Sequence, residues 1–266
     1  NQAYFDRMRQ RIIDAGNRGM YVSVMLFNGW SVMAEQYPSL NNPWKGHPFN
    51  QANNVNGVNG DVNGDNSGSD THTLVNAQVT QYQEAYVKKV IDTVGDLDNV
   101  LYEISNESPD NSIQWQYHMI DVIKAYEATK AKQHPVGMSG RYEWDLNLLL
   151  NSRADWISPG GGAFQWEPQE NDGKKVIVND TDHLWGIGGD RYWVWKSFTR
   201  GLNPLFMDQY DDSYKLEGGG YDMTNANDVS LRANLGYTRQ YAERIDLAHM
   251  PPRGDLCSTG YCLANK

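Results

Sequence analysis

Apolar residues along the chain fall into two recurring arrangements. Short continuous apolar runs between turn-forming residues are typical of buried strands, and apolar residues three or four positions apart are typical of helices. The short runs predict six strands, at 20–27, 100–107, 135–140, 154–158, 174–180 and 204–208. The helical spacing predicts helices at 3–16, 76–95, 111–131, 193–201 and 228–247.

The order of these elements is strand, loop and helix, repeated along the chain. This order predicts parallel strands joined by crossover helices, and therefore an α/β protein. Every predicted strand ends in polar or aromatic residues, and a (β/α) TIM-type barrel carries its functional side chains at that end of its strands. We therefore expect an incomplete TIM-type barrel, with six of the eight strand–helix units, as a catalytic domain over residues 1–250. Residues 251–266 are expected to form a C-terminal tail, which resembles the start of a further β domain cut short.

The stretch 100–109 carries the first candidate for chemistry. It is a short apolar run that ends in Asn106, Glu107 and a turn-forming Ser-Pro pair. A carboxylate at the C-terminal end of a barrel strand lies where such folds keep their catalytic groups. The alternative is a helix N-terminus, with Ser105 or Asn106 as the cap and Glu107 in the first turn.

A second acidic strand end follows at Asp180 and Asp182, which have the same parity along the predicted strand. Two carboxyl groups facing each other across a barrel mouth are the minimum that glycoside hydrolysis requires. One, with a raised pKa, protonates the leaving oxygen, and the other attacks the anomeric carbon or activates water. The alternative role for these two aspartates is a helix cap or a structural salt bridge. The sequence leaves the choice between retention and inversion open.

A long irregular segment at 31–75 contains a Gly-, Asn- and Asp-rich core. Its oxygen-bearing side chains alternate as in a calcium loop, at Asp61, Asn63, Asp65 and Asp70. His72 stands where such loops have a bidentate glutamate at the twelfth position. The segment therefore predicts either a structural calcium site or an ordinary solvated loop, and we expect catalysis to need no cofactor.

Composition narrows the range of ligands. The chain has nine Trp and sixteen Tyr but only six Phe, a balance that suits stacking on polar rings such as sugars. Packing inside a large barrel is the alternative explanation for these residues. The candidates near predicted strand ends are Trp30, Trp44, Tyr142, Trp144, Trp166, Trp185 and Tyr210, among which we favour Trp30 and Trp185.

The formal charge of −10 argues against nucleic acid or an anionic membrane as a partner. No apolar run approaches the roughly 20 residues of a transmembrane helix, and residues 1–9 carry no hydrophobic signal segment. Cys257 and Cys262 lie five positions apart, so they form either a local disulfide in an oxidising compartment or two free thiols.

Four segments together resemble the clan A retaining glycoside hydrolases, and among them the cellulase-like bacterial members. These segments are Asn42–Asn50, Leu101–Glu107, Val178–His183 and Asn203–Asp208. The resemblance covers nearly the whole chain. It implies a (β/α)8 barrel whose fourth strand ends in an Asn-Glu pair and whose seventh strand carries the nucleophile.

The resemblance assigns roles by position. It implies that Glu107 is the general acid/base and that Asn106 bonds the 2-hydroxyl group of the substrate. The nucleophile position falls on Asp180, with Asp182 as the competing candidate. The substrate, a β-linked polysaccharide or oligosaccharide, is then expected to contact a further set of side chains, namely Trp30, His47, Tyr142, His183, Trp185 and Asp208.

Two departures from that family stand out. The family has Glu at the nucleophile position, and Asp180 is one methylene shorter. The strand at 20–27 matches the third barrel strand, so the first two are missing, and we expect a partner to cover the exposed edge or activity to be compromised. The expected protein is a secreted or periplasmic glycoside hydrolase. A non-catalytic or weakly active carbohydrate-binding relative is the alternative.

Overall fold

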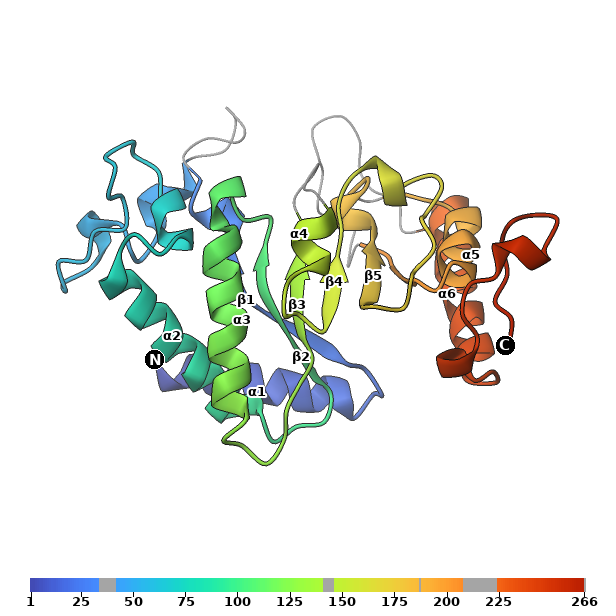
Figure 1. Cartoon of the computed structure of the whole chain (residues 1–266). Helices are drawn as coiled ribbons and strands as arrows, with labels where there is room; N and C mark the ends of the chain where they lie inside the picture. Colours follow the sequence, from blue (N-terminus) through green and yellow to red (C-terminus); the bar gives the residue numbers. More distant parts are fainter. Residues whose placement is uncertain (34–41, 141–145, 187, 208–223, 266) are drawn as a thin grey trace. The chain divides into compact units, whose positions relative to one another are not determined.

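The computed structural model describes residues 1–33, 42–140, 146–186, 188–207 and 224–265 (Figure 1). The chain folds as two compact units. Unit 1 comprises Asn1–Arg141 and Asn151–Asp155, and unit 2 comprises Tyr142–Leu150 and Trp156–Lys266. None of the described helices combines the length and hydrophobicity that crossing a bilayer requires.

Unit 1 is built on three parallel strands in chain order. Its helices and strands are α1 (Gln2–Gly16), β1 (Val22–Asn28), α2 (Ala77–Val94), β2 (Val100–Asn106), α3 (Ile113–Glu127) and β3 (Val136–Ser139). β2 pairs with β1 on one side and β3 on the other, and no further described strand pairs with β1. The register sets Asn28 opposite Asn106, so β1 and β2 end at the same level.

The core of unit 1 lies between these strands and the helices α2 and α3, which pack against each other (Figure 1). In α3 the buried positions recur every three or four residues, so that one face of the helix meets the sheet. The side chains that are fully buried there are Trp115, Met119, Ile120 and Ile123 of α3, with Tyr102 and Ile104 of β2.

A buried acid–base pair joins the end of α3 to the start of β3. The Glu127 carboxylate lies 2.7 Å from Nδ1 of His134 and accepts the His134 backbone N–H at 2.9 Å. Nε2 of His134 lies 2.8 Å from the carbonyl oxygen of Leu97, at the turn before β2. Side-chain exposures of 2% for Glu127 and 5% for His134 leave water no access to replace these partners.

Unit 2 contains a second run of parallel strands. Its elements are α4 (Leu146–Leu150), β4 (Trp156–Ser158), β5 (Val176–Asp180), α5 (Arg191–Thr199), β6 (Asn203–Leu205) and α6 (Ala226–Ala242). β5 pairs in parallel with β4 and with β6. α5 packs against α6, where the rings of Trp195 and Tyr241 meet edge to face at 5.6 Å.

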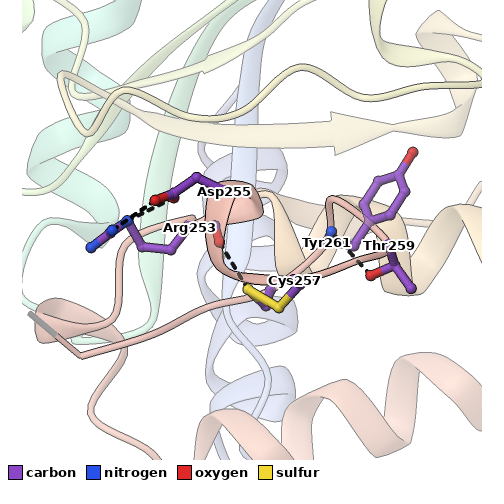
Figure 2. The surroundings of a disulfide bond; sticks show 6 residues. Arg253, Asp255, Cys257, Thr259 and Tyr261 are labelled. Carbon is purple, nitrogen blue, oxygen red and sulfur yellow. Dashed lines mark hydrogen bonds and ion pairs between the residues drawn. A yellow bond between two sulfur atoms is a disulfide. The ribbon is translucent and has the colours of Figure 1, made fainter.

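The C-terminal segment is joined by a disulfide between Cys257 and Cys262, so of the two alternatives left by the sequence the structure has the bonded pair (Figure 2). Arg253 pairs with Asp255 within this segment, and its backbone N–H donates to the carbonyl of Cys262 at 2.8 Å. Tyr261 extends the segment toward α5. Its hydroxyl donates to Glu167, and its ring lies 4.5 Å from the guanidinium of Arg200.

The structure confirms the α/β class, the six predicted strands and their parallel pairing within each unit. Some limits were wrong. α3 ends at Glu127 and α6 at Ala242, each four or five residues earlier than the apolar spacing predicts. In α3 the early end places Glu127 where it can bond His134, so a tertiary contact overrides the local pattern. The short helix α4 was not predicted.

We predict that Glu127→Ala lowers the free energy of unfolding by about 1–3 kcal/mol or more, because it leaves Nδ1 and the backbone N–H of the buried His134 without their partner. Asp121→Ala is the matched control, since Asp121 lies on the same helix and pairs with Arg153 at the surface. We expect that control to change stability by less than about 1 kcal/mol. Urea unfolding followed by circular dichroism measures both, and equal costs would contradict the prediction.

Candidate functional site

The end of β2 holds Glu107 in an unusual backbone conformation. The strand ends at Asn106, and Glu107 follows with φ of 46°, in the left-handed region that non-glycine residues rarely adopt. The strand interpretation of this stretch is confirmed, and the helix-cap alternative is wrong, because α3 begins only at Ile113. The alternation of faces along β2 therefore stops before Glu107.

A close approach between the ends of β1 and β2 fixes this turn. A Cβ atom placed on Gly29 would lie 2.0 Å from the carbonyl oxygen of Glu107 and 2.6 Å from Cα of Ser108. Only glycine allows the two backbones to meet in this way. The Asn28 side chain accepts the backbone N–H of Trp30 at 2.9 Å, which begins the 3-10 helix η1 (Gly29–Ser31).

η1 brings Trp30 to the acid. Nε1 of Trp30 donates a hydrogen bond to Oε2 of Glu107. Both side chains are half-buried. The predicted acid and one of the two favoured aromatic residues therefore belong to one cluster in unit 1.

Behind Glu107, a chain of buried polar groups holds the next residue in place. The Ser108 hydroxyl lies 2.5 Å from the Ser105 hydroxyl and 3.0 Å from Nδ1 of His72. The His72 ring stacks on Trp115 with centroids 4.3 Å apart and planes 6° apart. This chain connects η4 (Ser69–His72) to the strand end, so the long irregular segment supports the turn that carries Glu107.

Both histidines of that segment are neutral at physiological pH. Burial, with a smaller contribution from the nearby His47, lowers the pKa of His72 to about 3. Burial alone lowers the pKa of His47 to about 4. The His47 ring stacks on Trp44, and its Nδ1 accepts the backbone N–H of Phe49 at 3.1 Å. The 3-10 helix η2 (Pro43–Gly46) immediately before it packs against η1.

A second buried carboxylate lies further back on β2. Glu103 is 9% exposed, and the hydroxyl of Ser139 on β3 donates to its Oε1. The sequence placed Glu103 on one face of the strand but gave no reason to expect this partner, because the register of β2 with β3 decides it.

In unit 2, β5 ends at Asp180, whose side chain caps the 3-10 helix η7 (Thr181–His183). Oδ1 of Asp180 accepts the backbone N–H of Asp182 at 3.0 Å. The cap predicted as the alternative role is thus present. Because the strand gives way to η7 after Asp180, the alternation of faces does not extend to Asp182.

Burial raises the pKa of the Asp180 carboxyl, and the negative charge of Asp182 adds to this effect. The backbone hydrogen bond from Asp182 and the neighbouring His183 act in the opposite direction and only partly offset it. A half-buried strand-end acid with a raised pKa is an environment that active sites use for proton transfer.

The residues around Asp180 are anchored by side-chain hydrogen bonds. Asn179, fully buried, donates to the Ser197 hydroxyl of α5 at 2.8 Å. Thr181 accepts the backbone N–H of Met207 at 2.8 Å. Nδ1 of His183, which is 5% exposed, lies 2.9 Å from the Ser158 hydroxyl at the end of β4. His183 therefore joins two neighbouring strand ends.

The predicted site residues fall into two groups. Asn106, Glu107, Trp30 and His47 belong to unit 1, whereas Asp180, Asp182, His183 and Trp185 belong to unit 2. Tyr142 and Asp208, like Trp144 and Tyr210, lie outside the described residues. Sequence reasoning missed Gly29, Ser105 and Ser108 as supports of the acid. The local sequence pointed to this contact only through Gly29 and Trp30, which directly follow a strand.

The predicted calcium ligands bond mainly to their own loop. Asp61 accepts the backbone N–H groups of Gly64 and Asp65 through Oδ1 and that of Asn66 through Oδ2. Asp70 accepts those of Val62 and Asn63, while Asn63 donates to Asp65. Among the described residues, no group of three or more His, Cys, Asp or Glu side chains is arranged to hold a metal ion. The calcium site stays a prediction.

Neither a family model, nor a curated protein, nor a solved structure matches the chain.

We predict that Gly29→Ala lowers the free energy of unfolding by about 1–3 kcal/mol or more, because its Cβ forces the ends of β1 and β2 apart. Gly236→Ala is the matched control, since Gly236 lies inside α6 with no atom within 4 Å of an added Cβ. We expect that control to gain about 0.5–1 kcal/mol from helix propensity. Denaturant unfolding measures the free energy of unfolding of both variants. A Gly29→Ala protein as stable as wild type would refute the close approach of the two backbones.

We predict that Asp180→Asn stabilises the protein relative to wild type increasingly as pH rises. A raised folded-state pKa means that proton binding by Asp180 favours the folded state below its ordinary value of about 3.9, and this stabilisation is lost at higher pH. Asn keeps an acceptor for the Asp182 N–H without the charge. Thermal unfolding of both proteins between pH 4 and 7 measures the difference.

Asp172→Asn serves as a control of opposite sign. Hydrogen bonding from Lys174 lowers the pKa of Asp172, so this replacement removes stability that is present only above the ordinary carboxyl pKa. A gap between Asp180→Asn and wild type that stays constant or narrows with rising pH would contradict the assignment.

Proposed function

We propose that the protein is a glycoside hydrolase that cleaves a β-linked polysaccharide or oligosaccharide. Glu107 acts as the general acid/base, and Asp180 or Asp182 acts as nucleophile or base. The observation that carries the proposal is the strained backbone of Glu107 at a strand end, held against Gly29 and bonded to Trp30. Backbone strain of this kind costs about 1–3 kcal/mol and persists where the surrounding structure enforces it, often at active sites.

The surroundings of Glu107 suit a group that gives and takes a proton. The Trp30 indole donates to one carboxylate oxygen and presents an aromatic ring beside it. A sugar ring stacked against such an indole would lie within reach of the acid. Asn106, at the end of the same strand, takes the role of bonding the substrate 2-hydroxyl, as in the clan A enzymes that the sequence resembles.

In this proposal the fold is the incomplete TIM-type barrel of that clan. Support comes from the six parallel strands and from the acidic residues at the C-terminal ends of β2 and β5. Large apolar side chains are exposed on β1 and directly before it: Met25 in the strand is 43% exposed, and Tyr21 before it is 72% exposed. An association that covers this edge belongs to the proposal. Secretion or periplasmic location fits the disulfide and a polysaccharide substrate.

A carbohydrate-binding barrel without turnover is the second candidate. The raised pKa of Asp180 favours it, because a carboxyl group that holds its proton more strongly is less available in the ionised form that attacks an anomeric carbon. Retention requires the two carboxyl groups about 5–5.5 Å apart and inversion roughly 6.5–9.5 Å, so the anomeric configuration of the product separates the two mechanisms.

We expect Glu107→Gln to lower kcat/KM on aryl β-glycosides and polysaccharides by at least about 100-fold, since it removes the general acid/base. Glu243→Gln is the matched control, because Glu243 follows the last residue of α6 and pairs with Arg239 at the surface. We expect this replacement to leave the rate unchanged. The measurement is turnover on a panel of substrates, with circular dichroism to confirm folding. Equal activity of Glu107→Gln and wild type would remove Glu107 from the mechanism. Sugar binding without turnover by wild type would favour the second candidate.

A further inference from the structure

Unit 2 contains a cavity of about 200 Å³ beside the N-terminus of α5. Four of its eight lining residues are aromatic, and we call it the aromatic pocket: Trp166, Trp185, Tyr192 and Trp193. These residues come from the loop before β5, the loop after η7 and the first turn of α5. Of them, only Trp185 was favoured from the sequence as a sugar-binding residue.

Three of the rings lie roughly perpendicular to their neighbours. Trp185 meets Trp166 edge to face at 5.2 Å and Trp193 edge to face at 5.5 Å. Trp193 is buried and forms the wall, whereas Trp166 is 66% and Tyr192 60% exposed. Large aromatic faces exposed around a hollow are a feature of binding sites rather than of ordinary surface.

Three polar side chains around the aromatic pocket bond to neighbouring groups, whereas the buried indole Nε1 of Trp185 has no hydrogen-bond partner among the described residues. Lys196 pairs with Glu167 and donates to the carbonyl of Trp166 at 3.2 Å. Asp190 accepts the backbone N–H of Trp193 at 2.8 Å. The Gln165 amide donates to the carbonyl of Leu184 at 3.0 Å.

These bonds limit the chemistry of the occupant. Because Lys196 is already paired with Glu167, the wall offers no dedicated phosphate site, and Asp190 is engaged by the backbone N–H of Trp193. The wall therefore offers a ligand mainly the flat faces of its aromatic rings, with polar side chains around them. A sugar ring matches this arrangement, since it has an apolar face of C–H groups and hydroxyls around its edge, and it is neutral.

We propose that the aromatic pocket binds one sugar ring of a neutral polysaccharide as a subsite of its own. This inference takes its substrate class from the proposed function. The volume is below the roughly 300–1,000 Å³ of sites for drug-sized ligands, so the pocket suits a single ring of a longer chain. Gly189 maintains its shape, because its φ of 84° favours glycine and an added Cβ would lie 3.3 Å from the Trp185 ring.

The experiment measures saccharide binding in the absence of turnover. Isothermal titration calorimetry compares Glu107→Gln with the double variant Glu107→Gln/Trp166→Ala, using cellotetraose, xylotetraose and mannotetraose as probes. Trp166→Ala removes one exposed ring while keeping the carbonyl that Lys196 bonds. Loss of that ring should weaken binding of at least one probe roughly tenfold. Tyr237→Ala in the same background is the matched control, since it removes an exposed ring from α6 and should leave affinity unchanged.

The outcomes separate this proposal from the proposed function. Binding that depends on Trp166 and not on Tyr237 supports the aromatic pocket, even if wild type hydrolyses none of the probes. Equal affinity with and without Trp166 overturns the aromatic pocket, even if turnover depends on Glu107. Binding of none of the three probes by Glu107→Gln, with circular dichroism showing a folded protein, also overturns it. Trp166→Phe, which keeps a ring, should restore most of the affinity.

Discussion

The absence of a side chain at Gly29 is the constraint on which the candidate site in unit 1 depends. Two parallel strands in register end level with each other, and their outgoing chains then touch backbone to backbone. That contact leaves Glu107 in the left-handed region and turns Trp30 toward its carboxylate. The acid is thus positioned by main-chain contact directly after two paired strands, which suits chemistry that needs a fixed proton donor.

The support around this contact is polar, buried and shared among distant segments. Ser105 belongs to β2, Ser108 to the turn after it, and His72 to the long segment before α2. In unit 2, Asn179, Thr181 and His183 bond three different neighbours in a similar way, to α5, to the chain after β6 and to β4. Each unit therefore fixes its strand-end acid through side chains that flank it in sequence.

The sequence predicted most of the elements, because apolar periodicity reflects burial, and burial dominates where strands and helices form. It also predicted that Glu107 and Asp180 stand at strand ends. It did not predict the left-handed turn at Glu107, since that arises from the register between β1 and β2, which no local pattern encodes. The parity argument failed for Asp182, because a 3-10 helix replaces the strand after Asp180.

The sequence also could not predict which side chains from different elements contact each other. Glu103 with Ser139 and Trp166 beside Trp185 come together only through the order of strands and loops in space. The aromatic pocket shows the same limit, because tryptophan content suggested sugar stacking but not which rings would share a cavity.

The low pKa values of His47 and His72 affect how the pH dependence of activity can be interpreted. Histidines ordinarily change charge between about pH 5 and 8, the range in which most enzyme assays are done. These two have already lost their protons below that range, so both rings stay neutral throughout it. An activity change across that interval would then originate in other groups, and the support around Glu107 would act as a constant background.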